Sequence, residues 1–290
     1  QLASVEAGAV LADLCGDGAD AGDGEPAPPA AVAGSIVRLT RSHRYAATGG
    51  IGRLAEAVRA GDADAALAIL ADAGQADVER CELASSAALT TRLGFEVRRL
   101  EAAVAGERLP EARLARLGDY RVLCAHRRGP FGVEALSRVL DEAAALERRV
   151  ASRGVEWPGR LVLVTRNAPA QSLWNGDVGL VERLPEGLRA LFPDPKGGVR
   201  SLSLARLPAH ESAIAMSVHK SQGSEFRTVD LVLAPHPTRL MTRELLYTGI
   251  TRARERLRIH ASEAVLRAAI ARRARRDSGL ADRLREMGAS

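Results

Sequence analysis

Residues 217–226, which read Ser-Val-His-Lys-Ser-Gln-Gly-Ser-Glu-Phe, constrain the fold of this chain more than any other stretch. The apolar run that leads into them, residues 213–218, predicts a buried strand that breaks into a polar turn. A glycine in this turn, Gly223, allows a positive φ and lets a ligand approach the backbone closely. Open α/β sheets bind ligands at strand ends, so the stretch predicts a binding loop.

Strand-like and helix-like segments alternate along most of the chain, which predicts an α/β layer with a largely parallel sheet. The expected strands are residues 35–40, 120–124, 213–218, 229–234 and 257–260. The expected helices are residues 49–60, 63–73, 84–105 with a break near Gly94, 133–151, 244–253 and a basic amphipathic helix at 264–276.

Between residues 160 and 211 the pattern changes to short strands that are separated by turn residues. We expect strands at residues 161–165, 178–181 and 199–204. The sequence Asn175-Gly176-Asp177 between the first two is a tight-turn signal. These residues therefore predict a small β module inserted into the α/β domain.

Composition limits the class of protein. Apolar residues make up 46% and aromatic residues 3%, so the core must be aliphatic. The absence of an apolar run near 18–20 residues argues against a transmembrane helix, and no signal peptide is visible, so we expect a cytoplasmic protein without a membrane partner. Cys15, Cys81 and Cys124 are odd in number and far apart, which indicates reduced thiols with neither a disulfide framework nor a zinc site. The charge of +5 is weak support for a nucleic-acid partner, because almost all of the 41 basic residues are arginine and a GC-rich coding sequence explains that bias.

The chain lacks both parts that hold a magnesium nucleotide in P-loop proteins. Lys220-Ser221 is the one Lys-Ser/Thr pair, but His219 and Ile214 occupy the positions where a phosphate loop needs glycine. The Asp-Glu pair at residues 141–142 lies inside the expected helix 133–151 instead of ending a buried strand. That spacing predicts a solvated helix face and no metal ligand.

Two long stretches resemble motifs of one family. Residues 217–226 resemble motif V of the RecD-type helicases of superfamily 1, and residues 244–257, Glu-Leu-Leu-Tyr-Thr-Gly-Ile-Thr-Arg-Ala-Arg-Glu-Arg-Leu, resemble motif VI. Residues 1–11 resemble the end of motif III, where the first motor domain of the family ends. The resemblance implies a RecA-like second motor domain with a small SH3-like β-barrel insertion. It also implies that the phosphate loop and the magnesium carboxylates lie upstream.

The domain boundaries follow from this resemblance. We expect a discontinuous motor domain at residues 1–159 and 212–265, the β insertion at 160–211, and a basic helical tail at 266–290. Residues 61–118 contribute little to the likeness.

The resemblance also implies a nucleotide site for ATP, with Mg²⁺ held mainly by the missing upstream domain. Arg44 and Arg252 match two arginines that contact the γ-phosphate, with Arg41 and Arg254 as close rivals. Two guanidinium groups reaching across a cleft would stabilise charge on the transferred phosphoryl group. Glu225 matches a carboxylate that contacts the ribose, Gly223 stands in the same loop, and Gln1 would couple the γ-phosphate to DNA.

The same motifs imply contacts with single-stranded DNA. Motif V would bring His219, Lys220 and Ser221 to the DNA backbone, with charge from the lysine and hydrogen bonds from the others. Thr165 and Asn167, at the end of the first strand of the insertion, lie where the family faces DNA. Trp174 could stack on a base, but in a chain with so few aromatic residues we expect it in the core.

The leading hypothesis is the C-terminal motor half of an ATP-dependent 5′–3′ DNA helicase. The family acts with RecB and RecC subunits, as exodeoxyribonuclease V, in double-strand break repair and recombination. A stand-alone RecD-like helicase or a relaxase-associated helicase shares the motifs. The alternative of another class is a non-catalytic module that binds DNA or a partner, and in either case we expect no ATP turnover from the isolated chain.

Overall fold

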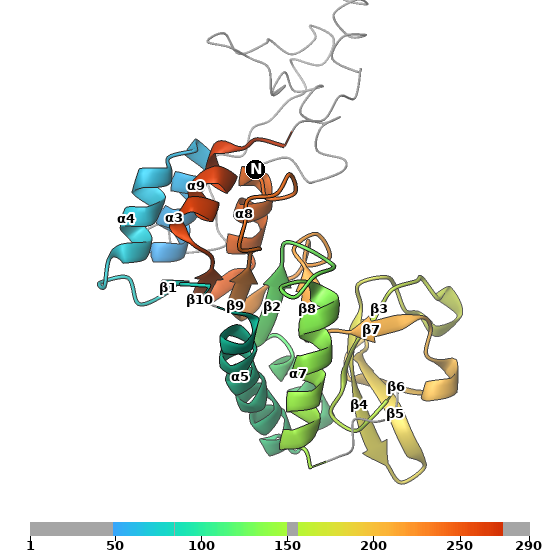
Figure 1. The fold of residues 1–290 in the computed structure, drawn as a ribbon. Coiled ribbons are helices and arrows are strands. Elements are labelled where there is room, and N and C mark those ends of the chain that lie inside the picture. Colours follow the sequence, from blue (N-terminus) through green and yellow to red (C-terminus); the bar gives the residue numbers. More distant parts are fainter. Residues whose placement is uncertain (1–48, 84, 150–155, 275–290) are drawn as a thin grey trace, which may run out of the picture.

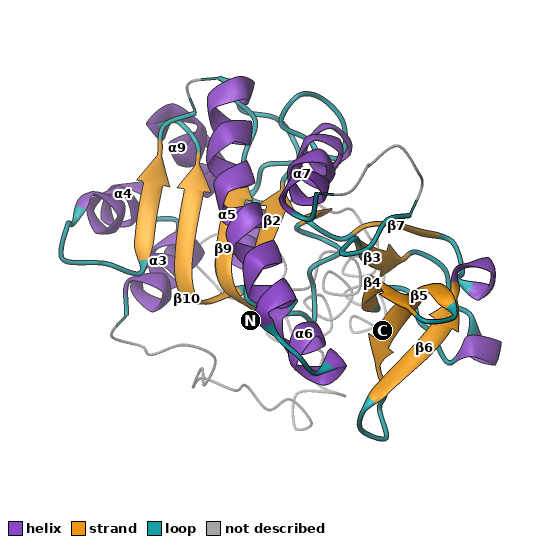
Figure 2. Cartoon of the chain, turned by 90° about the horizontal axis from the view of Figure 1, so that it is seen from below, coloured by secondary structure: helices purple, strands orange, loops and turns teal. Residues whose placement is uncertain are grey.

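The computed structural model describes residues 49–83, 85–149 and 156–274. Its main layer is a sheet of five strands in the order β1-β10-β9-β2-β8, and every neighbouring pair in it is parallel (Figures 1 and 2). The predicted parallel α/β layer is therefore confirmed. The strands are β1 (Val78–Cys81), β2 (Tyr120–Cys124), β8 (Ala215–Ser217), β9 (Phe226–Val232) and β10 (Ala253–His260). The strand expected at residues 35–40 lies outside the described residues.

Helices lie on either side of this sheet (Figure 1), as parallel strands require if both faces are to be buried. One group packs around α3 and α8, and the other is the pair α5 and α7, with the short α6 beside α5. The helices are α3 (Gly50–Ala60), α4 (Ala63–Ala71), α5 (Ser86–Gly106), α6 (Pro110–Arg116), α7 (Val133–Glu147), α8 (Arg243–Ile250) and α9 (Glu263–Ala271).

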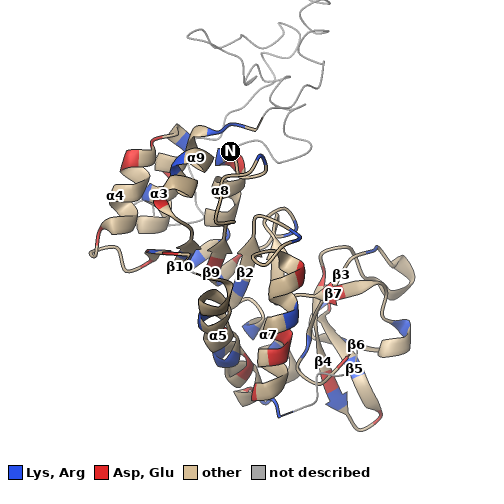
Figure 3. Cartoon of the chain, in the orientation of Figure 1, with Lys and Arg blue, Asp and Glu red and all other residues tan. Residues whose placement is uncertain are grey.

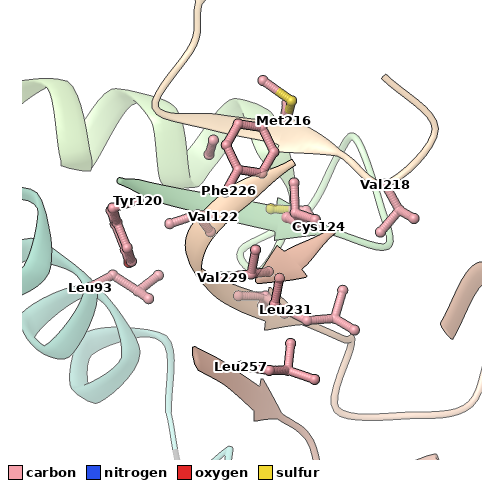
Figure 4. Packing of buried hydrophobic residues seen from close by; sticks show 14 of the residues in the cluster. Leu93, Tyr120, Val122, Cys124, Met216, Val218, Phe226, Val229, Leu231 and Leu257 are labelled. Carbon is pink, nitrogen blue, oxygen red and sulfur yellow. The ribbon is translucent and has the colours of Figure 1, made fainter. Parts of the chain in front are cut away.

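The core between the layers is aliphatic, as the composition predicts. Figure 4 shows side chains of β2, β9 and β10, among them Val122, Leu231 and Leu257, with Leu93 of α5 to one side of them. The break expected near Gly94 is wrong, since α5 is continuous. A Cβ at Gly94 would lie 3.7 Å from the Cβ of Ala143 on α7, so this glycine lies where the two helices approach closely.

The inserted module is a second sheet, antiparallel, in the order β6-β5-β4-β3-β7. Its strands are β3 (Leu161–Val164), β4 (Val178–Leu184), β5 (Gly187–Pro193), β6 (Val199–Ser203) and β7 (His210–Ser212). The sequence did not predict β5 and β7, nor β1 and α6 in the motor domain. At the predicted tight turn, Gly176 has φ +102°, which glycine adopts without strain.

The two sheets share a core. Four leucines of the module (Leu161, Leu163, Leu180 and Leu191) belong to the main hydrophobic cluster, which also holds the parallel sheet. Alternate residues, among them Val162 and Phe192, form a smaller cluster inside the module. The module is therefore packed onto the parallel-sheet domain by one face of its strands β3, β4 and β5.

Charged residues surround this shared core, and we call the contact between the α5–α6–α7 helices and the module the seam. Figure 3 shows acidic and basic residues on α7 beside β3 and β7. Asp141 of α7 accepts a hydrogen bond of 2.8 Å from Ser212 of β7 and lies 3.6 Å from Arg160. The expected solvated position of Asp141 is wrong, because the module covers it and burial raises the pKa of its carboxyl to about 6.

Candidate nucleotide and nucleic-acid site

The loop with the motif V sequence, residues 218–225, runs along the whole sheet. It leaves β8 at Ser217, which is paired with Cys124 at the carboxyl end of β2. It enters β9 at Phe226, two residues before the partner of Tyr120 at the amino end of β2. The loop therefore starts on the side of the sheet where the parallel strands end. It finishes, with Glu225, on the side where these strands begin.

Hydrogen bonds within the loop fix its first half. Ser221 is fully buried, its hydroxyl donates to the carbonyl of Val218 at 2.7 Å, and its amide donates to Ser217 at 3.2 Å. His219 is exposed beside it. A contact between the Ser221 hydroxyl and DNA would require this turn to open.

Lys220 points from the motif V loop to the module. Its ammonium Nζ lies 2.6 Å from Oε1 of Glu211 on β7, and both side chains are about one-third exposed. The sequence did not single out Glu211. The one available signal is its place at the end of the insertion, immediately before the strand that leads into the loop.

Arg252 lies at the other end of the loop, just before β10. Its guanidinium donates to the carbonyl of Ser224 at 3.0 Å and to that of Thr248 at 3.1 Å. Its own carbonyl accepts from the amide of Phe226 at 2.8 Å, and the side chain is buried. Motifs V and VI, which are about 20 residues apart in the sequence, thus meet at the amino ends of the parallel strands. Arg252 contacts Ser224 and Phe226, and Glu225 lies between these two residues.

Gly223 and Glu225 are exposed in this part of the loop. Gly223 has φ +85°, and a Cβ built there meets no atom within 4 Å. The glycine is therefore needed for the conformation of the turn, and the space beside it is open. Arg44 and Gln1 lie outside the described residues.

The DNA candidates of the module lie on the loop that follows β3. Thr165 donates through its hydroxyl to the carbonyl of Ala209 at 2.9 Å, and Asn167 accepts from the amide of Asn175 at 2.8 Å. The core position expected for Trp174 is wrong, because 52% of this residue is exposed while Trp157 is buried. These residues form one side of the module, next to β7 and its Glu211.

A buried electrostatic network lies elsewhere, in the parallel sheet. Asp230 of β9 accepts two hydrogen bonds of 2.9 Å from Arg258 and one of 2.6 Å involving His260, both on β10. Burial alone would raise the pKa of the Asp230 carboxyl, but His260 and Arg258 outweigh it and lower that pKa. Arg258 also donates to Glu96 of α5, so the network fastens a helix to the sheet.

In the described ranges, no three His, Cys, Asp or Glu side chains are grouped as metal ligands. Within the same ranges, no helix combines the length and the apolar character needed to cross a bilayer.

The comparisons with known proteins identify the class. Residues 212–260, which include the loop, β9, α8 and β10, match the model of the UvrD-like helicase C-terminal domain. This part of the chain is therefore similar to a helicase C-terminal domain, and the parallel sheet together with this match supports the predicted RecA-like fold.

The relatives then narrow the class, and they confirm the resemblance to RecD-type proteins. The chain is 40% identical to the RecBCD enzyme subunit RecD of Mycolicibacterium smegmatis, over 99% of this chain and 48% of that protein. It is 30% identical to the same subunit of Haemophilus influenzae, over 99% of this chain and 49% of that protein. The chain thus spans about half the length of these relatives. Among solved structures, a Pif1 helicase from Bacteroides in complex with ADP-AlF3 and single-stranded DNA is 13% identical, with a TM-score of 0.42 over 88% of this chain and 57% of that one.

Proposed function

We propose that the complete protein is an ATP-dependent 5′–3′ DNA helicase of the RecD type and that this chain is its second motor domain. The observation that carries the proposal is the contact between Arg252 and the carbonyl of Ser224. It sets a buried guanidinium beside the exposed carboxylate-bearing end of the motif V loop. An arginine and a carboxylate held at one edge of a motor sheet suit the two ends of a nucleotide, its phosphates and its ribose.

ATP, when bound between two motor domains, supplies the phosphoryl group whose transfer drives translocation. The donors on this chain fit the outer phosphate and the ribose, while the magnesium ion and the inner phosphates would be held by residues upstream. Arg252 would exchange its bond to Ser224 for a charge-assisted bond to the γ-phosphate, and Glu225 would accept from ribose hydroxyls. Arg44 would supply the second guanidinium, Gly223 would keep the turn open, and Gln1 would link the γ-phosphate to DNA.

Single-stranded DNA would bind at the opposite end of the loop. His219 and Lys220 are the side chains available there, with Ser221 behind them, and Thr165 and Asn167 continue the surface onto the module. Because one loop joins both sites, closing the nucleotide cleft would shift the DNA contacts. That is the coupling which a translocating motor needs.

The domain division that we propose with this function is the one expected from the sequence. We propose a motor domain at residues 1–159 and 212–265, an SH3-like insertion at 160–211 and a basic tail from 266 to 290. The five antiparallel strands of the insertion support an SH3-like barrel. By the resemblance to RecBCD subunits, the complete protein would work in the cytoplasm with RecB- and RecC-like partners in double-strand break repair.

The test is Arg252→Ala in the complete protein, with Arg254→Ala as the matched control, since Arg254 is exposed two residues away. DNA-stimulated ATP hydrolysis should fall about 1,000-fold for Arg252→Ala, the scale of a lost arginine finger. DNA binding by the variant should remain close to that of the parent. A normal hydrolysis rate in Arg252→Ala, or a collapse in Arg254→Ala alone, would remove the assignment.

Two other functions share the motifs. A stand-alone helicase is the second candidate, because the chain is also 35% identical over 172 residues to a protein that is named as a helicase and not as a RecBCD subunit, the ATP-dependent RecD2 DNA helicase of Deinococcus radiodurans. A non-catalytic module that binds DNA or a partner would have no in-frame Gly-Lys-Thr and Asp-Glu motifs upstream of Gln1. Sequencing the region upstream of Gln1 therefore distinguishes the non-catalytic module from both helicase hypotheses, the RecBCD-type subunit and the stand-alone helicase.

A further inference from the structure

Trp174 is exposed on a loop that is firmly built. Its amide donates to the carboxylate of Asp177 at 2.8 Å, and its neighbour Leu173 is fully buried and bridges to Ala168. Arg200 of β6 holds the same loop from outside by donating to the carbonyls of Gln171 and Ser172. The exposure of the indole is therefore a property of an ordered loop.

No second large apolar side chain is exposed with Trp174 on the described part of the module. The others of the described ranges lie in the motor domain, at Phe95, Leu109, Leu146 and Leu240. Protein interfaces of standard size bury an apolar centre, which an isolated tryptophan does not supply. An isolated exposed aromatic ring is instead the usual platform for a base of a single strand.

A cation is available for the accompanying phosphate. Arg166 lies on the same loop, is exposed, and makes no hydrogen bond or ion pair in the described ranges. The two acidic residues nearest to Arg166 in the sequence have other partners. Glu156 is bound to Arg160 and His210, and Asp177 accepts from the amide of Trp174. The loop thus offers a ring and a guanidinium for one nucleotide.

The loop also continues the proposed DNA surface of the motor domain. Glu211, which holds Lys220, is paired with Leu163 of β3. Two residues further along the chain, about 7 Å in an extended strand, Thr165 meets Ala209. The amide of Gly176 then donates to the carbonyl of Val164 at 2.9 Å, which brings the Trp174 turn back to the same strand end.

We propose that Trp174 is a stacking site for one unpaired base of single-stranded DNA, on the stretch of strand that leaves the motif V loop over the module. This inference rests on the proposed function, because Lys220 must bind the neighbouring backbone. The base is read by its ring face only, so the site accepts any of the four bases.

The experiment measures the affinity of the complete protein for two probes of equal length: oligo(dT) and an oligonucleotide whose residues are abasic. Trp174→Ala should weaken oligo(dT) binding about 5- to 100-fold, the effect of losing one stacked base. It should leave the affinity for the abasic probe unchanged, and Trp174→Phe should restore most of the binding. Phe95→Ala, which removes an exposed aromatic ring from α5, is the control and should change neither affinity.

Lys220→Gln distinguishes a failure of the proposed DNA path along the motif V loop from a failure of the stacking site at Trp174. If it weakens both probes while Trp174→Ala weakens neither, the motor reading stands and the stacking site is lost. If Lys220→Gln has no effect, the proposed DNA path itself fails. An equal loss for both probes in Trp174→Ala would contradict stacking.

Discussion

Lys220 and Glu211 form an ion pair that joins the motif V loop to the last strand of the module, with 2.6 Å between Nζ and Oε1. The lysine is the side chain with which the loop would hold a DNA phosphate. In the absence of DNA its charge is compensated by a carboxylate from the other sheet. A phosphate must therefore compete with Glu211 for the same ammonium group.

Glu211→Gln should raise the affinity for single-stranded DNA about two- to five-fold, because a partly exposed pair contributes at most about 1 kcal/mol. The dependence of the dissociation constant on salt should become steeper, since Lys220 then binds phosphate without releasing a partner. Glu186→Gln adds the same charge to the module at an exposed pair with Arg189 and should change neither quantity. Weaker binding by Glu211→Gln would show that the carboxylate positions the lysine and does not compete for it.

Asp230→Ala should lower the free energy of unfolding by about 3–5 kcal/mol, because it leaves the Arg258 guanidinium buried without its bidentate partner. Chemical denaturation followed by circular dichroism measures the change. Glu263→Gln, which breaks an exposed pair with Arg267, is the control and should cost less than about 1 kcal/mol. A similar small loss for both variants would contradict the structural importance of the buried network.

Stability should fall as pH rises from about 5 to 8. Burial raises the pKa of the Glu101 carboxyl from 4.5 to about 7 against the opposing effect of Arg148, and that of Asp141 from 3.8 to about 6. The folded chain holds these protons more tightly than the unfolded chain. The stabilisation is therefore complete below the unfolded pKa values and is lost as pH rises through the folded ones.

Melting temperatures measured across this pH range test the effect. The double variant Glu101→Gln with Asp141→Asn should flatten the profile, while Glu82→Gln, at an exposed carboxylate, should leave the slope unchanged. His210 adds to the same slope, because the hydrogen bond to Glu156 raises the pKa of its imidazole. A melting temperature that climbs over the same range would contradict these pKa directions.

The chain alone should release no phosphate from ATP, with or without oligo(dT), since its sequence has no phosphate loop. A phosphate-release assay on the purified chain checks this, with the complete protein as the positive control. Turnover by the chain at the rate of the complete protein would overturn the half-motor hypothesis.

Sequence patterns sufficed for the parts of the fold where burial and periodicity agree. The strand Tyr120–Cys124 is buried at every position, and the helix start at Gly50 and the module strands β3 and β4 also follow local patterns. Three strands were missed for physical reasons. The strand β1 has two charged residues in its middle, β5 begins with glycine and ends with proline, and β7 has only 3 residues, so their pairing depends on neighbours distant in sequence.

In the candidate site, too, the sequence predicted the local features and missed those that depend on distant contacts. The sequences of motifs V and VI pointed to Lys220 and Arg252. In the structure Arg252 contacts the motif V loop through the carbonyl of Ser224. The ion pair of Lys220, the cover over Asp141 and the exposure of Trp174 all depend on how the module sits on the motor domain. No local pattern records that placement.

The four leucines that the module contributes to the main core have a consequence for engineering the protein. Removing residues 160–211 would leave a cavity in the core beneath the parallel sheet. It would also expose an apolar face on the excised peptide. The two sheets are therefore expected to unfold in a single transition, and neither is expected to fold in a protein engineered without the other.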